Sequence, residues 1–463
     1  MRARGGAVLV AVFTTGIVVC TPGPAAAHSG GGAGLPLPVG LVVAGAGIVL
    51  IASYLTLTVS WTEPKLQGGP IHRAVRVRGL GGVAGALRFV GLAGLALVML
   101  NGVIGDAGSS RAIGPPVVWI ALWLVVPFLS VAAGNFWRFL SPWRSLARLL
   151  MREEPGQPQW TPRLGVWPAT AVLGGFTWFE LVSRDSTRPG MLAIAATVYT
   201  VYLLAASRWL GSEAGVGSCC VFENYTSLLG AMSPIAWSDT RRRSPGAQVV
   251  HRRAELTYRG WLRGLPAVPV QPGLTAFLLV LIGTVTYDGI SGAEWWGSLF
   301  GRLEFEQGFR TVALTGVVLV VGGSYALAAW VAARLERNGD TVTAVARSFA
   351  HTLVPIAFAF AFAHYFSVVL NGGQALIHAA SDPFGLEWDL LGTATWRTVF
   401  FLPPAVTSWV QIAVIVAGHV AALLLVHDRA LHRFGAAGAP RSEYALLTLL
   451  VASCSVGLLV LVG

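Results

Sequence analysis

Six side chains of types that bind metals or move protons lie near one predicted end of the molecule. They are His28, Glu180, Asp288, His364, His378 and Asp382. A mixture of histidine and carboxylate ligands suits zinc, and a histidine at a mature amino terminus would also suit copper. The sequence has no HExxH or CxxC spacing that would mark a known metal site. The candidates therefore rest on residue type and on position along the chain.

Two of these residues, Glu180 and His364, fall inside hydrophobic segments, and Asp288 directly follows another. Ionisable groups within a membrane are costly and are functional candidates by default. We expect all three near one depth, each within about two to three helical turns of the same membrane face. The catalytic candidates are Glu180, Asp288 and His364, and the metal-ligand candidates are His28, His364, His378 and Asp382.

A polar stripe is predicted on another hydrophobic segment. Helical spacing places Ser408, Gln411 and His419 on one side of a helix. Because a polar stripe facing lipid would leave its hydrogen bonds unmade, we expect it to face the protein interior.

The composition shows what kind of element must position these residues. Hydrophobic residues make up 54% of the 463 and charged residues only 11%, with a mean hydropathy of +0.66. These values exclude a soluble globular enzyme and a disordered chain, and they indicate a polytopic membrane protein. The net charge of +11 does not indicate nucleic-acid binding, because the basic residues lie between apolar segments.

Ten apolar segments are long enough to be predicted as membrane spans, which gives an all-α polytopic helix bundle. They cover residues 37–60, 81–104, 115–134, 166–183, 191–209, 268–287, 311–333, 348–370, 401–426 and 444–462.

A signal peptide is predicted before the first span. Arg2 and Arg4 precede a short apolar stretch, and residues 25–27 supply an A-x-A cleavage site. Cleavage after Ala27 would leave residues 28–463 as a single transmembrane domain beginning at His28.

The distribution of basic residues predicts an orientation. If the mature chain starts outside, the inner loops carry 23 basic residues and the outer loops carry six. Such an imbalance follows the positive-inside rule and predicts that both mature termini lie outside the cytoplasm. The longest cytoplasmic loop covers residues 211–265, and its arginines are expected to contact anionic lipid.

The first five and last five predicted spans have opposite topology. An inverted five-plus-five repeat would be typical of a transporter. In that alternative, the spans at 348–370 and 401–426 enclose the site, and Pro355 kinks the first of them.

Several sequence blocks together resemble a family of bacterial integral membrane proteins labelled fenitrothion hydrolase. The blocks include WTEPKLQ at 61–67, FTWFELV at 176–182, IGTVTYDG at 282–289, AHTLVPI at 350–356, AHYFS at 363–367, ASDPFG at 380–385 and HDRA at 427–430. The resemblance covers most of the mature chain. It implies a polytopic membrane fold and hydrolysis of an organophosphorus ester, and it assigns no catalytic residues.

Three function classes follow from the sequence. A membrane hydrolase would need an activated water at the outer face, most simply on a metal. A secondary transporter would use a site between the two kinked spans. A metal-handling or assembly partner would bind through His28 and the outer loops.

Overall fold

The computed structural model describes most of the chain after the predicted signal peptide. The described residues are 37–67, 73–75, 80–105, 112–151, 161–243, 250–300, 306–336 and 340–462. The predicted signal peptide at 1–27 and His28 lie outside them.

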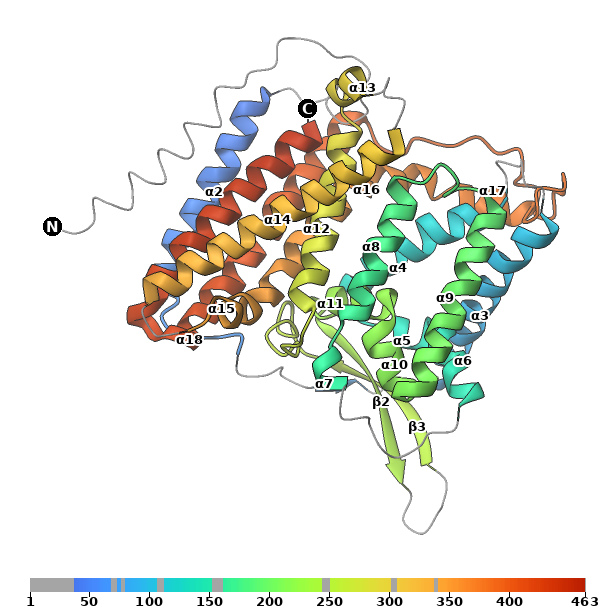
Figure 1. The fold of residues 1–463 in the computed structure, drawn as a ribbon, viewed down its shortest axis with the longest axis horizontal. Coiled ribbons are helices and arrows are strands. Elements are labelled where there is room, and N and C mark those ends of the chain that lie inside the picture. Colours follow the sequence, from blue (N-terminus) through green and yellow to red (C-terminus); the bar gives the residue numbers. More distant parts are fainter. Residues whose placement is uncertain are drawn as a thin grey trace.

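The fold is an all-α bundle of membrane-length helices, as the sequence predicts (Figure 1). Its long elements are α2 (Val39–Ser60), α3 (Leu80–Ile104), the π-helical η1 (Pro116–Val125) with α4 (Val126–Ala133), α8 (Trp167–Leu181), α9 (Pro189–Leu210), α12 (Leu274–Ser291), α14 (Glu306–Glu336), α16 (Val354–Ser367) and α18 (Pro404–Val462). Shorter helices are α5 (Trp137–Leu140), α6 (Pro142–Leu150), α7 (Thr161–Leu164), α10 (Ser212–Cys219), α11 (Val221–Gly230), α13 (Glu294–Phe300), α15 (Val342–Phe349), η2 (Ala350–Leu353), η3 (Val368–Gly372) and α17 (Ala375–Ser381).

The count of full-length spans is nine among the described residues, not ten. The exception is the segment predicted at 166–183, which forms α8 with only 15 residues. At about 1.5 Å per residue, α8 is about 22 Å long, whereas a bilayer core is about 30 Å thick. It lies within the bundle as a shorter tenth helix (Figure 1).

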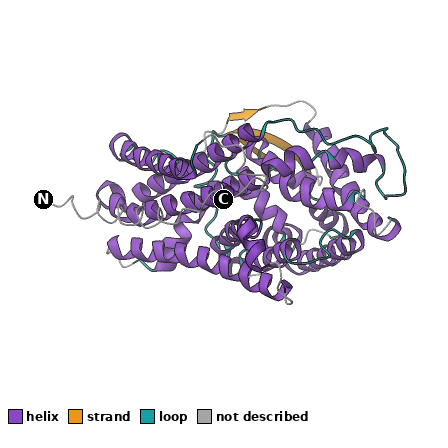
Figure 2. Ribbon diagram, turned by 90° about the horizontal axis from the view of Figure 1, so that it is seen from above, coloured by secondary structure: helices purple, strands orange, loops and turns teal. Residues whose placement is uncertain are grey.

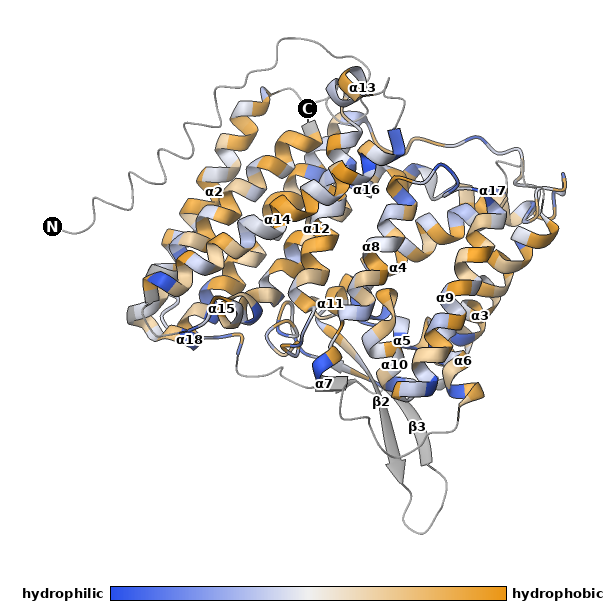
Figure 3. Cartoon of the chain, viewed as in Figure 1, coloured by the Kyte–Doolittle hydropathy of each residue, from blue (hydrophilic) through white to orange (hydrophobic). Residues whose placement is uncertain are grey.

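The outer surface of the long helices is suited to lipid. Val59 and Val103 are each 82% exposed, and Val312 and Val320 are each 71% exposed. Figure 3 shows hydrophobic residues over the middle of the bundle and hydrophilic residues gathered towards its two ends. Exposed aliphatic surface of this extent would aggregate in water, so the chain is a multi-pass membrane protein.

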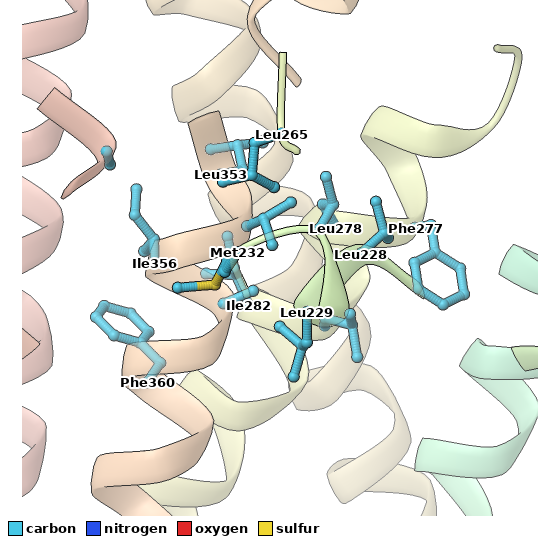
Figure 4. Close-up of a cluster of buried hydrophobic side chains, with 14 of the residues drawn as sticks. Leu228, Leu229, Met232, Leu265, Phe277, Leu278, Ile282, Leu353, Ile356 and Phe360 are labelled. Atoms are coloured by element: carbon cyan, nitrogen blue, oxygen red, sulfur yellow. The ribbon is translucent and has the colours of Figure 1, made fainter. Parts of the chain in front are cut away.

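The centre of the bundle is packed by α11, α12 and α16. Leu229, Leu278, Ile282 and Ile356 come from these three helices and lie together in Figure 4. Leu278 is 1% exposed and Ile356 is 4% exposed. This apolar layer holds the helices that carry the candidate site residues.

A small β-sheet lies at one end of the bundle, and the sequence did not predict it. Its strands are β1 (Arg73–Val75), β2 (Ile235–Arg243) and β3 (Val250–Tyr258), in the order β1-β3-β2, and all are antiparallel. In Figure 2 the sheet is a minor addition to a helical molecule. We call the end of the bundle that carries β2 and β3 the hairpin end, and the opposite end the far end (Figure 1).

The loop predicted at 211–265 is instead largely folded. Its first part forms α10 and α11, which turn at Cys220 and pack into the bundle against α8, α9 and α4. Most of α11 is buried, including Glu223 and Tyr225. We call α10 and α11 the inserted hairpin. A buried ion cluster explains how this polar sequence is accommodated, because Arg144 pairs with both Glu213 and Glu223.

The helices do not separate into a first and a second half. The first long helix, α2, packs on α18, the last one, whereas α3 packs on α9. Figure 1 shows α2, α14 and α18 side by side, away from α3 and α9. The inverted five-plus-five repeat stays a prediction.

Candidate functional site

The central feature of the site is Asp288, which accepts two hydrogen bonds from α16. The Nε2 atom of His364 lies 2.9 Å from the Asp288 Oδ2 atom. The hydroxyl group of Tyr365 donates to the same oxygen at 2.7 Å. Two neighbouring residues of α16 therefore bind a single carboxylate oxygen of Asp288, which lies on α12. The Asp288 side chain is 25% exposed.

Glu180 of α8 approaches this pair from a third helix. Its carboxyl group interacts electrostatically with Asp288 and with the hydroxyl of Tyr365. The buried Trp123 indole lies next to Glu180, but its N–H has no hydrogen-bond partner of normal geometry. The structure thus brings Asp288 and His364 into contact, and Glu180 interacts electrostatically with Asp288. We call Glu180, Asp288, His364 and Tyr365 the carboxylate cluster.

The cluster is open to its surroundings on one side. The His364 side chain is 30% exposed, although it lies within a membrane-length helix. A small cleft beside it is lined by Thr286, Phe360 and Gly457. Gly289 lies next to the His364 ring. A β-carbon added at Gly289 would be 3.7 Å from the Nδ1 atom of His364. The Nε2 atom of His364 therefore binds Asp288, whereas its Nδ1 atom lies beside Gly289.

The metal-ligand candidates do not meet. Among the residues that the structure describes, no three His, Cys, Asp or Glu side chains are placed to hold a metal ion. Asp382 instead fixes a loop, because its two carboxylate oxygens accept the backbone N–H groups of Leu386 and Glu387. His378 lies on α17, and His28 is outside the described residues.

The polar stripe is turned into the protein. Ser408, Gln411 and His419 are each no more than 4% exposed. The two ring nitrogens of His419 lie 2.8 Å from the carbonyl oxygen of Ile415 and 3.0 Å from the hydroxyl of Ser453. The contact with Ser453 ties together the two arms of α18, which meet at a sharp break at Gly435.

The spans predicted at 348–370 and 401–426 pack closely against each other at Gly418. A β-carbon added at Gly418 would lie 2.3 Å from Ala359 Cβ and 2.8 Å from the carbonyl oxygen of Pro355. Pro355 follows the 3₁₀ turn η2, so the predicted interruption of the helix is present. The small cleft beside His364 lies between α16 and α18, because Phe360, Ile415 and Gly457 all line it.

Sequence reasoning missed Tyr365 and Tyr225. Tyr365 follows His364 directly, yet both side chains reach Asp288. Tyr225 lies on the inserted hairpin, contacts the Trp123 ring at 5.2 Å and interacts electrostatically with Glu180. The sequence offered a signal for Tyr365, because its hydroxyl directly follows a candidate histidine. The position of Tyr225 depends on helix packing, which sequence spacing does not reveal.

A second buried polar cluster lies at the hairpin end and has a structural role. Asp428 is fully buried and accepts the backbone N–H groups of Lys65 and Leu66 as well as the side-chain amide of Gln67. His427 is held between both carboxylate oxygens of Glu443, each at 3.1 Å. We call Asp428 with residues 65–67 the loop clasp.

Comparisons of the chain with protein-family models, with curated proteins and with solved structures found no match.

Proposed function

We propose that this multi-pass membrane protein exchanges protons at the carboxylate cluster and couples that exchange to transport. The observation that supports the proposal is the contact between Asp288 and His364 within membrane-length helices, next to Glu180. Carboxyl and imidazole groups inside membrane helices are typical of proton relays in transporters. Two neighbouring carboxyl groups that interact would also tend to share one proton between them.

The arrangement supplies each part that proton exchange needs. The partly exposed His364 can take up or release a proton through its ring. Tyr365 and His364 stabilise the ionised form of Asp288 through charge-assisted hydrogen bonds. The helices α8, α12 and α16 contribute Glu180, Asp288 and His364, respectively. A shift of these helices relative to one another would change which of these groups can bind the proton.

Proton flux into liposomes tests this proposal. The purified protein is reconstituted with a pH-sensitive dye inside, and a membrane potential is imposed with potassium and valinomycin. We expect flux with the wild type and with Asp185→Asn, which removes a carboxylate at the far end outside the cluster. Asp288→Asn and Glu180→Gln should abolish it. Absence of flux in the wild type, or equal flux in all variants, would refute the proposal.

Hydrolysis is the second candidate function, and the orientation of His364 favours it. A histidine that lines a cleft and has a carboxylate bound to one ring nitrogen resembles a general base that activates water. The resemblance to the family labelled fenitrothion hydrolase implies an organophosphorus ester as substrate. Release of a nitrophenol from fenitrothion should then occur with the wild type and be lost in His364→Ala. No release by folded wild-type protein would eliminate this candidate.

We further propose that the hairpin end faces the cytoplasm of a bacterium and that both mature termini lie outside. The support is the division of basic residues, 23 against six, between the predicted inner and outer loops. In this orientation the carboxylate cluster, which lies towards the far end, is reached from the outside.

A further inference from the structure

A large apolar cavity lies away from the carboxylate cluster. It has a volume of about 820 Å³, within the range of ligand pockets. The helices α3, η1, α8 and α9 surround it, and α9 packs on α3 while α8 packs on α12. We call this cavity the chamber. It lies between the two helix pairs.

Aromatic residues close the two ends of the chamber. Towards the far end, the Trp119 indole donates to the Ser186 carbonyl at 2.9 Å. Towards the hairpin end, the Trp143 indole donates to Thr200, and its ring stacks on Phe222 of the inserted hairpin. The polar atoms of both tryptophans are thereby satisfied, and the wall that remains is apolar.

The chamber lies next to exposed apolar surface of the bundle. Three of its lining residues, Val90, Ile194 and Val198, are 58%, 57% and 63% exposed. The residues that line the chamber therefore belong to helices that also carry exposed apolar surface. Its wall follows α9 from Met191 to Tyr202, a length of about 16 Å.

The contents of such a space are limited by its chemistry. Water does not fill an apolar cavity that offers it no hydrogen bonds. An empty space of this size would lose the packing contacts of its whole wall. The apolar chain of a membrane lipid satisfies both conditions.

A cationic side chain is placed for the head group. Arg88 lies one helical turn before Gly91, which lines the chamber. Its guanidinium group lies 5.7 Å from the centre of the Phe139 ring, and no carboxylate among the described residues pairs with it. We propose that the chamber binds one anionic phospholipid, with an acyl chain inside and its phosphate at Arg88.

Native mass spectrometry of delipidated protein titrated with phosphatidylglycerol or phosphatidylcholine of identical chains tests the proposal. Gly175→Phe is a filling variant that should place a ring in the path of the acyl chain, and a β-carbon at Gly175 meets nothing within 4 Å. Gly94→Leu is a second filling variant with the same property. Gly174→Phe is the matched control, on the same helix but not in the wall of the chamber.

We expect the wild type and Gly174→Phe to retain one phosphatidylglycerol in preference to phosphatidylcholine. Both filling variants should lose the retained lipid, and Arg88→Gln should bind the two lipids equally. Retention by the filling variants would overturn the proposal. Recovery of a free fatty acid in place of a phospholipid, or an unchanged lipid preference in Arg88→Gln, would also overturn it.

Discussion

Two aspartates, Asp288 and Asp428, are the centres of two separate polar clusters in this protein. In the carboxylate cluster, Asp288 is partly exposed and is held by two donors from one helix. In the loop clasp, Asp428 is fully buried and accepts three N–H groups from one loop. The two carboxylates differ in exposure, as the proposed proton exchange at Asp288 requires, because a group that exchanges protons must be reached by water.

Tyr365→Phe tests the cluster at the level of one hydrogen bond. The change keeps the ring and removes only the hydroxyl that donates to Asp288. A hydrogen bond to a charged group contributes about 1.5–3 kcal/mol, so we expect proton flux to fall about tenfold or more. Flux in reconstituted liposomes measures the effect, with Tyr444→Phe on an exposed tyrosine as the control. An unchanged rate would remove Tyr365 from the site.

Asp428→Ala should destabilise the protein without affecting proton exchange. Three donors of the loop at 65–67 would lose their acceptor. Removing a buried charged partner costs about 3–5 kcal/mol, measurable as a lower free energy of unfolding. Asp340→Ala, which breaks a half-exposed pair with Arg433, should cost about 1 kcal/mol or less. Equal costs for the two variants would contradict the role of the clasp.

Among the secondary-structure elements, the inserted hairpin is the least expected. The helices α10 and α11 have only eight and ten residues, too short to be identified as membrane segments. Both of their acidic residues pair with Arg144, which lies 69 positions before Glu213, and only Glu223 is buried. No local pattern contains that information. β2 was missed for a similar reason, because its sequence IAWSDTRRR lacks the alternation typical of a strand.

Arg144→Met should destabilise the inserted hairpin. It leaves Glu223 buried without its cation, at a cost of about 3–5 kcal/mol in the free energy of unfolding. The triple variant with Glu213→Gln and Glu223→Gln should recover most of this loss, because no unpaired charge remains. Arg184→Met, at an exposed pair with Glu306, is the control and should change little. Failure of the triple variant to recover stability would show that packing, not charge, dominates.

The same ion cluster predicts sensitivity to acid. Burial alone would raise the pKa of Glu213, but Arg144 and Arg148 outweigh burial and hold it below its ordinary value. A lowered pKa adds stability above the unfolded-state value, about 4.3, and this stability is lost as the pH falls through the folded-state value. Unfolding measured from pH 7 to pH 3 should show this loss in the wild type, and Glu213→Gln should flatten it. A wild type with the same pH profile as Glu213→Gln would contradict the prediction.

For the molecule as a whole, hydrophobic composition predicted most of the fold. Nine of ten predicted spans appear as full-length helices among the described residues, since twenty apolar residues have few alternatives in lipid. The depth of Glu180, Asp288 and His364 followed from the same pattern. Which side chains touch depends on the rotation of α8, α12 and α16 about their axes, and one sequence does not determine these rotations.

Reporter fusions test the proposed orientation of the whole molecule. A reporter that is active only outside the cytoplasm, placed after Gly463, should be active. The same reporter inserted between Arg243 and Val250, at the tip of the β2–β3 hairpin, should be silent. The reverse pattern would invert the molecule and place the carboxylate cluster nearer the cytoplasm.

Infrared difference spectroscopy of the folded protein tests the central claim, that the carboxylate cluster binds an exchangeable proton. Spectra are recorded between acidic and alkaline buffer, in H₂O and in D₂O, for the wild type, Glu180→Gln, Asp288→Asn and Asp185→Asn. We predict a protonated-carboxyl band that shifts in D₂O, is kept in Asp185→Asn, and is lost or displaced in both cluster variants. Cluster variants that keep the wild-type band unchanged would contradict proton binding at Glu180 and Asp288.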